Sequence, residues 1–342
     1  MRTLLTLPVL SLALGAGLLA CGAPPDRGGG GGSSDGGPGV DGGGSGDAGM
    51  SGDGGNPLAD CGSTASPRHH SYVPCGEHPT SAARLIVMGD SISVGYGATP
   101  QSGPDDYVNL LVSNDNTLWP AESNTSLTAL FGVGNVPIVS VAHAGDTTNN
   151  IAGDQLTNLS GALGASVTGH SIVVITIGGN DMFALVQQMS STTIDSDIGN
   201  FVSNLRTAIN YLQDPVRFPD GTSIYVANVY DPSDTSGVLP TACVGFPGSS
   251  ITNIPLEMGV VSLAAAYVTL AKELGFSVVD ALQHFYGHGL TAAMSSDPVY
   301  DSSDPVDWYY TDCIHPTNDG HNELRRLFFE AINTGHYVAT DI

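Results

Sequence analysis

Four short segments of the sequence carry side chains that can do chemistry together. They are residues 88–97, 142–148, 178–181 and 312–316. A serine hydroxyl such as that of Ser91 is a weak nucleophile until a neighbouring base takes its proton, and imidazole is the commonest base. The last segment offers His315, and Asp312 precedes it by three residues, where its carboxylate can orient the ring. These residue types suit acyl transfer by an activated serine, provided that the fold brings the segments together.

The rest of the sequence predicts the elements that would hold these segments. Five short runs rich in β-branched residues are typical of strands buried on both faces: residues 84–88, 137–141, 171–177, 223–229 and 276–279. Apolar residues three and four apart predict helices over residues 198–212, 256–274 and 322–333. This alternation indicates an α/β fold, a three-layer α/β/α sandwich with a mostly parallel central sheet of about five strands.

The order of these elements also predicts where the polar segments lie. The first three segments directly follow the first, second and third strands, and the fourth precedes the last helix. Active sites of parallel α/β sheets lie beyond the carboxyl ends of the strands. We therefore expect the polar residues to gather at that edge of the sheet.

In content and order, the four segments resemble the blocks of the SGNH (GDSL) hydrolase superfamily. Gly89–Ser91 matches its nucleophile block, Gly145 its glycine block, residues 178–181 its Gly-X-Asn-Asp block and residues 312–315 its Asp-X-X-His block. The resemblance covers residues 83–336. It implies hydrolysis of esters or thioesters, with small-molecule, lipid and acetylated polysaccharide esters all in range as substrates.

The resemblance also implies roles for individual residues. Ser91 would be the nucleophile, His315 the base and Asp312 the carboxylate that orients it. The backbone N–H groups of Ser91 and Gly145 and the side-chain amide of Asn180 match the family's oxyanion hole. Each assignment has a plainer alternative, because Asp312 could cap a helix, Gly145 could simply form a turn, and Asn180 could be a buried structural residue.

Four other histidines compete for the role of base, namely His143, His284, His288 and His321. None has an aspartate three residues before it, so we interpret them as surface or packing residues, and of the four we expect His143 to line the pocket.

Two aspartates adjoin the matched positions and are expected to brace loops, Asp90 and Asp181. The loops at residues 99–135 and 232–254 are expected to shape the pocket.

The first residues have the pattern of an export signal. Residues 1–20 combine Arg2 with a long apolar run, as in a signal peptide. The sequence Leu18–Cys21 resembles a bacterial lipobox, which implies cleavage before Cys21 and acylation of its thiol; the alternative is an ordinary secretory signal. We expect an exported protein, lipid-anchored to a bacterial membrane, at the outer membrane or cell surface, or otherwise secreted.

A glycine-rich stretch separates this signal from the predicted domain. Residues 21–60 have almost nothing to bury, so they predict a flexible tether. Residues 61–82 lead into the hydrolase domain, residues 83–342.

Four cysteines remain when Cys21 is set aside, an even number in a compartment where disulfides persist. They allow three pairings, and the sequence leaves the choice open. A Cys61–Cys75 bond would pin the end of the tether, and a Cys243–Cys313 bond would close a long loop of the C-terminal half; the alternative is free buried thiols. Cys313 lies between Asp312 and His315, where the family commonly has a small residue such as glycine.

Composition excludes several other classes of function. Nine Lys and Arg against 33 Asp and Glu give a net charge of −24, which repels nucleic acid. The ten histidines form no His-Glu-X-X-His pattern, so no metal and no cofactor are expected. We expect a monomer that meets the membrane only through its N-terminal lipid anchor. The alternatives are a non-catalytic surface-binding lipoprotein on the same fold, and an acyltransferase to a sugar or lipid acceptor.

Overall fold

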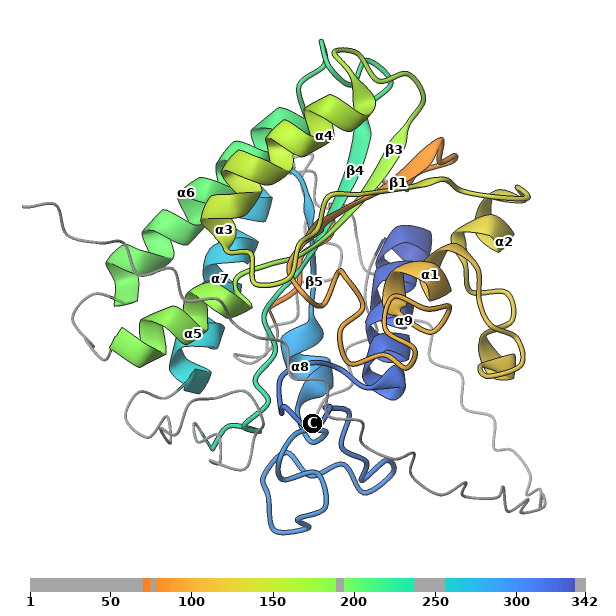
Figure 1. The fold of residues 1–342 in the computed structure, drawn as a ribbon. Helices are drawn as coiled ribbons and strands as arrows, with labels where there is room; N and C mark the ends of the chain where they lie inside the picture. The colour runs from red at the N-terminus through yellow and green to blue at the C-terminus, as the bar shows by residue number, and fades with distance from the viewer. Residues whose placement is uncertain (1–69, 75–77, 189–193, 237–255, 336–342) are drawn as a thin grey trace, which may run out of the picture. The chain divides into compact units, whose positions relative to one another are not determined.

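The computed structural model describes residues 70–74, 78–188, 194–236 and 256–335. Within these residues, five strands form one sheet in the order β2-β1-β3-β4-β5 (Figure 1). The strands are β1 Arg84–Gly89, β2 Ile138–Ser140, β3 Ser171–Thr176, β4 Thr222–Ala227 and β5 Ser277–Val279. Every pairing is parallel, so the predicted α/β fold with a five-stranded, mostly parallel sheet is confirmed.

The two faces of the sheet bury separate sets of side chains. In β1, Leu85 and Val87 join one apolar cluster, whereas Ile86 and Met88 join the other. This alternation follows from the two-residue repeat of a strand. Because both faces are covered, β1 and β3 carry continuous apolar runs, which is why the sequence predicted them well.

Helices cover both faces, as the three-layer prediction requires (Figure 1). The described helices are α1 Tyr107–Val112, α2 Leu127–Phe131, α3 Thr148–Asn150, a π-helix Ile151–Gln155, α4 Leu156–Leu163, α5 Gly179–Gln188, α6 Ile194–Leu212, α7 Leu256–Leu274, α8 Ala281–Phe285 and α9 Asn318–Thr334, with a short 3₁₀ helix Pro120–Glu122. Helices α1 and α9 pack on one face, and α4, α6 and α7 lie on the other.

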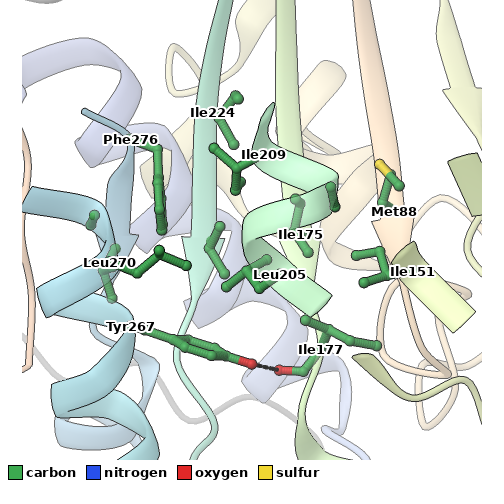
Figure 2. Packing of buried hydrophobic residues seen from close by; sticks show 14 of the residues in the cluster. Met88, Ile151, Ile175, Ile177, Leu205, Ile209, Ile224, Tyr267, Leu270 and Phe276 are labelled. Atoms are coloured by element: carbon green, nitrogen blue, oxygen red, sulfur yellow. Dashed lines mark hydrogen bonds between the residues drawn. The ribbon is translucent and has the colours of Figure 1, made fainter. Parts of the chain in front are cut away.

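The larger cluster fills the space between the sheet and helices α6 and α7 (Figure 2). Leu205 and Ile209 of α6 meet the strand residue Ile175 there. The hydroxyl of Tyr267 on α7 donates to the carbonyl oxygen of Ile177 at 3.2 Å. Helix α7 is thereby tied to the end of β3, next to the third polar segment.

The predicted helices differ from the observed ones mainly at their starts. Helix α7 has the predicted bounds, whereas α6 begins at Ile194 and α9 at Asn318. The early start of α9 has a local cause, because the hydroxyl of Thr317 accepts from the backbone N–H of Gly320 and caps the helix.

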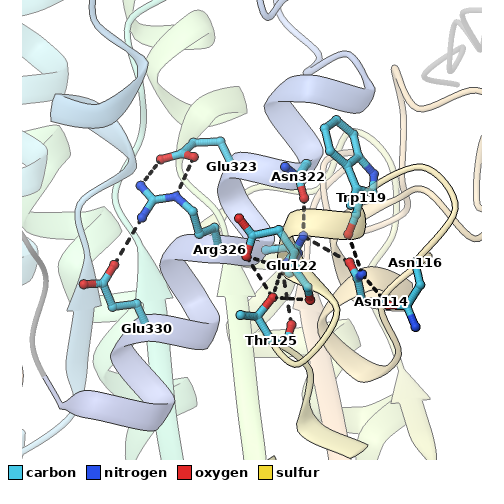
Figure 3. A network of polar contacts seen from close by, with 10 residues as sticks. Asn114, Asn116, Trp119, Glu122, Thr125, Asn322, Glu323, Arg326 and Glu330 are labelled. Carbon is cyan, nitrogen blue, oxygen red and sulfur yellow. Dashed lines mark hydrogen bonds and ion pairs between the residues drawn. The ribbon is translucent and has the colours of Figure 1, made fainter. Parts of the chain in front are cut away.

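Helix α9 is fixed to the loop between α1 and α2 by a buried charge (Figure 3). The guanidinium of Arg325 is fully buried and donates to Asn114, Glu122, Thr125 and Asn322. The next residue, Arg326, lies between Glu323 and Glu330 and donates to both carboxylates. These contacts hold the helix that directly follows the fourth polar segment.

The N-terminal predictions, namely the signal, the acylation of Cys21 and the tether, lie outside the described residues. So do three of the predicted disulfide cysteines, Cys61, Cys75 and Cys243. Cys313 is described and is disulfide-bonded; its partner lies outside the described residues, so the pairing stays a prediction. Among the described helices, none combines the length and apolar character needed to cross a membrane.

Candidate active site

Ser91 lies on a tight turn at the carboxyl end of β1. The turn begins at Gly89, whose φ of +135° suits glycine, and a Cβ there would come within 2.2 Å of the carbonyl oxygen of Thr176. The backbone N–H groups of Val94 and Tyr96 both donate to the carbonyl oxygen of Ser91. The turn therefore holds Ser91 beyond the end of its strand.

His315 lies within hydrogen-bond reach of both Ser91 and Asp312. Its Nε2 is 2.7 Å from the Ser91 Oγ, and its Nδ1 is 2.5 Å from the Asp312 Oδ2. Because a carboxylate accepts, Nδ1 carries the proton and donates to Asp312, which leaves Nε2 to accept from the serine hydroxyl. The fold thus brings together three side chains, two of which are 224 residues apart in the sequence.

The Asp312 carboxylate is held in its charged form. Burial alone would raise its pKa, but hydrogen bonds from the His315 ring and from the backbone N–H groups of His315 and Ile314 outweigh burial and lower the pKa. The two backbone bonds go to Oδ1, each at 3.0 Å. One oxygen of Asp312 therefore organises the loop while the other orients the imidazole.

Cys313, which lies between Asp312 and His315 in the sequence, has an unusual backbone conformation. Its φ is +61°, in the left-handed region that costs most residues other than glycine about 1 to 3 kcal/mol. Glycine adopts this conformation freely, which explains why a glycine suits this position. In this chain, the hydrogen bonds that Asp312 accepts from the backbone N–H groups of Ile314 and His315 hold the loop instead.

The three proposed oxyanion donors line one cavity with His315. Within the described part of the chain, the backbone N–H groups of Ser91 and Gly145 meet no protein acceptor. The amide of Asn180 donates one hydrogen to the carbonyl oxygen of Asp146 at 2.8 Å, which leaves its second hydrogen for an acceptor in the cavity. Asn180 thus has a structural contact in addition to a place in the cavity, and the two interpretations of this residue do not exclude each other.

Gly145 owes its place to backbone conformation. Its φ is +86°, and a Cβ built there would touch nothing within 4 Å. An added Cβ would therefore fit in space but would strain this backbone conformation, so the turn favours glycine whether or not its N–H binds an oxyanion.

The two neighbouring aspartates brace loops, as predicted. Asp181 accepts from the backbone N–H and the hydroxyl of Thr148, at 2.9 and 2.7 Å. Asp90 accepts from the N–H of Ile92 and the hydroxyl of Thr176, at 3.1 and 3.2 Å. Asp90 also lies against the cavity, and its burial raises its pKa to about 7.

The cavity has a volume of about 340 Å³ and mostly apolar walls. The walls come from α5, α7 and the residues that follow β4, including Met182, Phe183, Val229 and Val260. The expectation that residues 99–135 shape the pocket is wrong, because none of them lines it. The two α-helices in this range, α1 and α2, pack in the apolar cluster that also contains α9. Of residues 232–254, Pro232 lines the cavity, and residues 237–254 lie outside the described residues.

Sequence reasoning missed these apolar walls. Met182 and Phe183 follow Asn180 within one helical turn. Two apolar residues directly after the Gly-X-Asn-Asp segment were the available signal for this wall. No comparable signal marked Val260, which reaches the cavity only through the packing of α7.

None of the competing histidines lines this cavity. The expectation that His143 lines the pocket is wrong, because its side chain is 78% exposed and binds Asp146 in a separate surface hollow. His284 pairs with Glu323, and His288 stacks on Trp308.

His321 is a packing residue at the start of α9. It is fully buried and bridges the backbone of Tyr96 and Tyr107, and burial lowers its pKa to about 4. Across the described ranges, no group of three or more His, Cys, Asp or Glu residues is placed to hold a metal ion.

Comparison with known proteins gives a family match. The sequence model of the GDSL-like Lipase/Acylhydrolase family matches residues 87–322. An acetylxylan esterase from Geobacillus stearothermophilus is similar in structure, with 17% identity and a TM-score of 0.46, over 74% of this chain and 94% of that one. An extracellular lipase from Streptomyces rimosus has 19% identity and a TM-score of 0.39, over 74% of this chain and 99% of that one. No curated protein matches the sequence.

Proposed function

Because the chain belongs to the GDSL-like lipase/acylhydrolase family, we propose that it is a serine hydrolase that cleaves carboxylic esters and thioesters. The observation that carries this proposal is the chain of contacts from Asp312 through His315 to Ser91, at 2.5 and 2.7 Å, beside an open cavity. In the proposal, Ser91 is the nucleophile, His315 the general base and Asp312 the carboxylate that orients it.

The geometry supports a two-step reaction. The Ser91 Oγ attacks the ester carbonyl while its proton passes to the Nε2 of His315, and Asp312 stabilises the imidazolium. Collapse of the tetrahedral intermediate breaks the bond to the leaving oxygen or sulfur, which takes the proton from His315. Water then attacks the acyl-serine by the same route in reverse, releasing the acid and restoring the Ser91 hydroxyl.

Negative charge develops on the carbonyl oxygen in both steps. The backbone N–H groups of Ser91 and Gly145 and the free amide hydrogen of Asn180 are the donors proposed to bind it. Each such preorganised donor commonly stabilises the transition state by about 3 to 4 kcal/mol.

The cavity favours an apolar acyl group longer than acetyl. An acetyl group would fill only a small part of 340 Å³, whereas Ile177, Met182, Phe183 and Val260 add apolar contact along the walls. Each methylene buried there would contribute about 0.8 kcal/mol, or roughly a fourfold gain in kcat/KM, until the cavity is full.

The proposal includes export and a lipid anchor at Cys21. It is supported by the apolar run of residues 4–20, by the lipobox-like end of that run and by the glycine-rich composition of residues 21–60.

The test is hydrolysis of p-nitrophenyl esters of increasing acyl length by the purified mature protein. We expect kcat/KM to rise from acetate through butyrate to hexanoate, and an alkyl fluorophosphonate to abolish the activity by attaching to Ser91. Absence of hydrolysis across the series, with a folded protein, would contradict the proposed function.

A further inference from the structure

A buried glutamine outside the matched segments contacts two of the loops that carry the proposed oxyanion donors. Gln155 is 1% exposed and ends the π-helix Ile151–Gln155. Its Oε1 accepts from the backbone N–H of Gly89 at 2.9 Å, and its Nε2 donates to the Gly89 carbonyl oxygen at 2.6 Å and to the Asp146 Oδ2 at 2.7 Å. Both amide hydrogens are therefore used, and the partners fix which way the amide faces.

At Gly89, the Gln155 amide binds the backbone at the end of β1. The chain that follows β2 still pairs with β1 here, because the N–H of His143 donates to the Gly89 carbonyl oxygen at 3.1 Å. The Gln155 amide is a second donor to that carbonyl oxygen and the acceptor for the Gly89 N–H. Gly89 lies two residues before Ser91, so this contact fixes the turn that carries the nucleophile.

At Asp146, the same amide binds a residue that is connected to the other two proposed donors, Gly145 and Asn180. Asp146 directly follows Gly145, and its carbonyl oxygen accepts from the Asn180 amide at 2.8 Å. One side chain thus links the residue after Gly145, which also binds Asn180, to the strand end that leads into Ser91.

The π-helix lies between α3 and α4 and delivers Gln155 to this position. Its Ile151 and Gln155 are both buried, and Thr148, one turn earlier, is held by Asp181. A π-turn inserts an extra residue into a helix, is rare, and occurs often at functional sites.

We propose that Gln155 is a positioning residue that sets the spacing of the three oxyanion donors. The inference rests on the proposed ester hydrolysis, because a spacing of donors matters only if an oxyanion forms between them. A displacement of the donors by about 1 Å would slow the reaction about 10- to 100-fold. It would weaken the binding of the transition state more than the binding of the substrate.

The test compares Gln155→Met, which keeps the volume but has no amide, with wild type. We expect kcat for p-nitrophenyl butyrate to fall about 10- to 100-fold, with KM within about threefold. An alkyl boronic acid forms a tetrahedral adduct on an active serine, and its inhibition constant should rise in parallel with the loss of kcat. All rates are measured well below the thermal midpoint of each variant.

Asp146→Ala provides a second variant in case Gln155→Met does not fold. It removes one contact of Gln155 and leaves the Gly89 pair and the Asp146 backbone in place, so kcat should fall by a smaller factor, about tenfold. His143→Ala is the matched control, because it removes the other side-chain partner of Asp146 from an exposed position, and its kcat should equal that of wild type.

The outcomes separate this inference from the proposed function. A wild-type protein that neither hydrolyses the esters nor binds the boronic acid would overturn both. An active wild type whose folded Gln155→Met and Asp146→Ala variants keep wild-type kcat overturns the role of Gln155 alone. A loss of kcat with unchanged boronic acid affinity also overturns it, since the donors would then be correctly placed.

Discussion

Replacing Asp90 with asparagine should flatten the pH dependence of stability. Asp90 is 3% exposed, and burial raises the pKa of its carboxyl from 3.8 to about 7, against the opposing effect of hydrogen bonds from Ile92 and Thr176 and of the nearby His315. Between these two values the folded protein holds a proton that the unfolded chain has released. Stability therefore falls as pH rises through this window, because ionisation favours the unfolded chain.

The size of the effect follows from the two pKa values. The full shift is equivalent to about 4 kcal/mol, and roughly 2 to 3 kcal/mol of it is lost between about pH 5 and about pH 8. Asparagine keeps the shape of the side chain and an oxygen that can accept from Ile92 and Thr176, but it cannot ionise. Any constant cost of the substitution cancels when the two pH values are compared.

The assay is urea unfolding of wild type and Asp90→Asn at both pH values. We expect the free energy of unfolding of the variant to gain about 2 to 3 kcal/mol relative to wild type between the lower and the higher pH. Asp154→Asn, at an exposed position, is the control and should follow wild type. A difference that stays within about 0.5 kcal/mol across the range would refute the argument from burial.

Three further substitutions test other parts of the account. Asn180→Ala should lower kcat by about 10²- to 10³-fold with little change in KM. It should also cost about 1 kcal/mol of stability through the lost bond to Asp146. A near-normal kcat with a lowered thermal midpoint would refute the oxyanion role of Asn180. Val260→Phe narrows the cavity and should lower kcat/KM for the hexanoate ester at least about tenfold more than for the acetate; an equal effect on both would place the acyl group elsewhere. Cys21→Ser should move the protein from the membrane to the soluble fraction in cell fractionation, and continued membrane association would indicate a different attachment.

The sequence was most informative where local pattern and tertiary environment agree. The apolar runs of β1 and β3 are continuous because both faces are buried, so their positions could be predicted closely. The carboxyl ends of parallel strands share one edge of the sheet, which is why Ser91 and Asn180 could be expected together.

Features set by long-range packing could not be predicted in this way. Gln155 contacts Gly89, which is 66 residues earlier, and an isolated glutamine in a helical stretch has no pattern that marks it. The left-handed backbone of Cys313 depends on its surrounding bonds rather than on a preference of cysteine. His143 was misplaced because adjacency to Gly145 in sequence does not fix the direction of a side chain.

The most direct test of the central claim is the rate of p-nitrophenyl butyrate hydrolysis by Ser91→Ala. The substitution removes the nucleophilic oxygen and little packing, so the far-ultraviolet circular dichroism and thermal midpoint should match wild type. The account predicts that kcat/KM falls by at least about 10³-fold, because no other hydroxyl bonds to His315 in the described structure. A folded Ser91→Ala variant that keeps a tenth or more of the wild-type rate would contradict it.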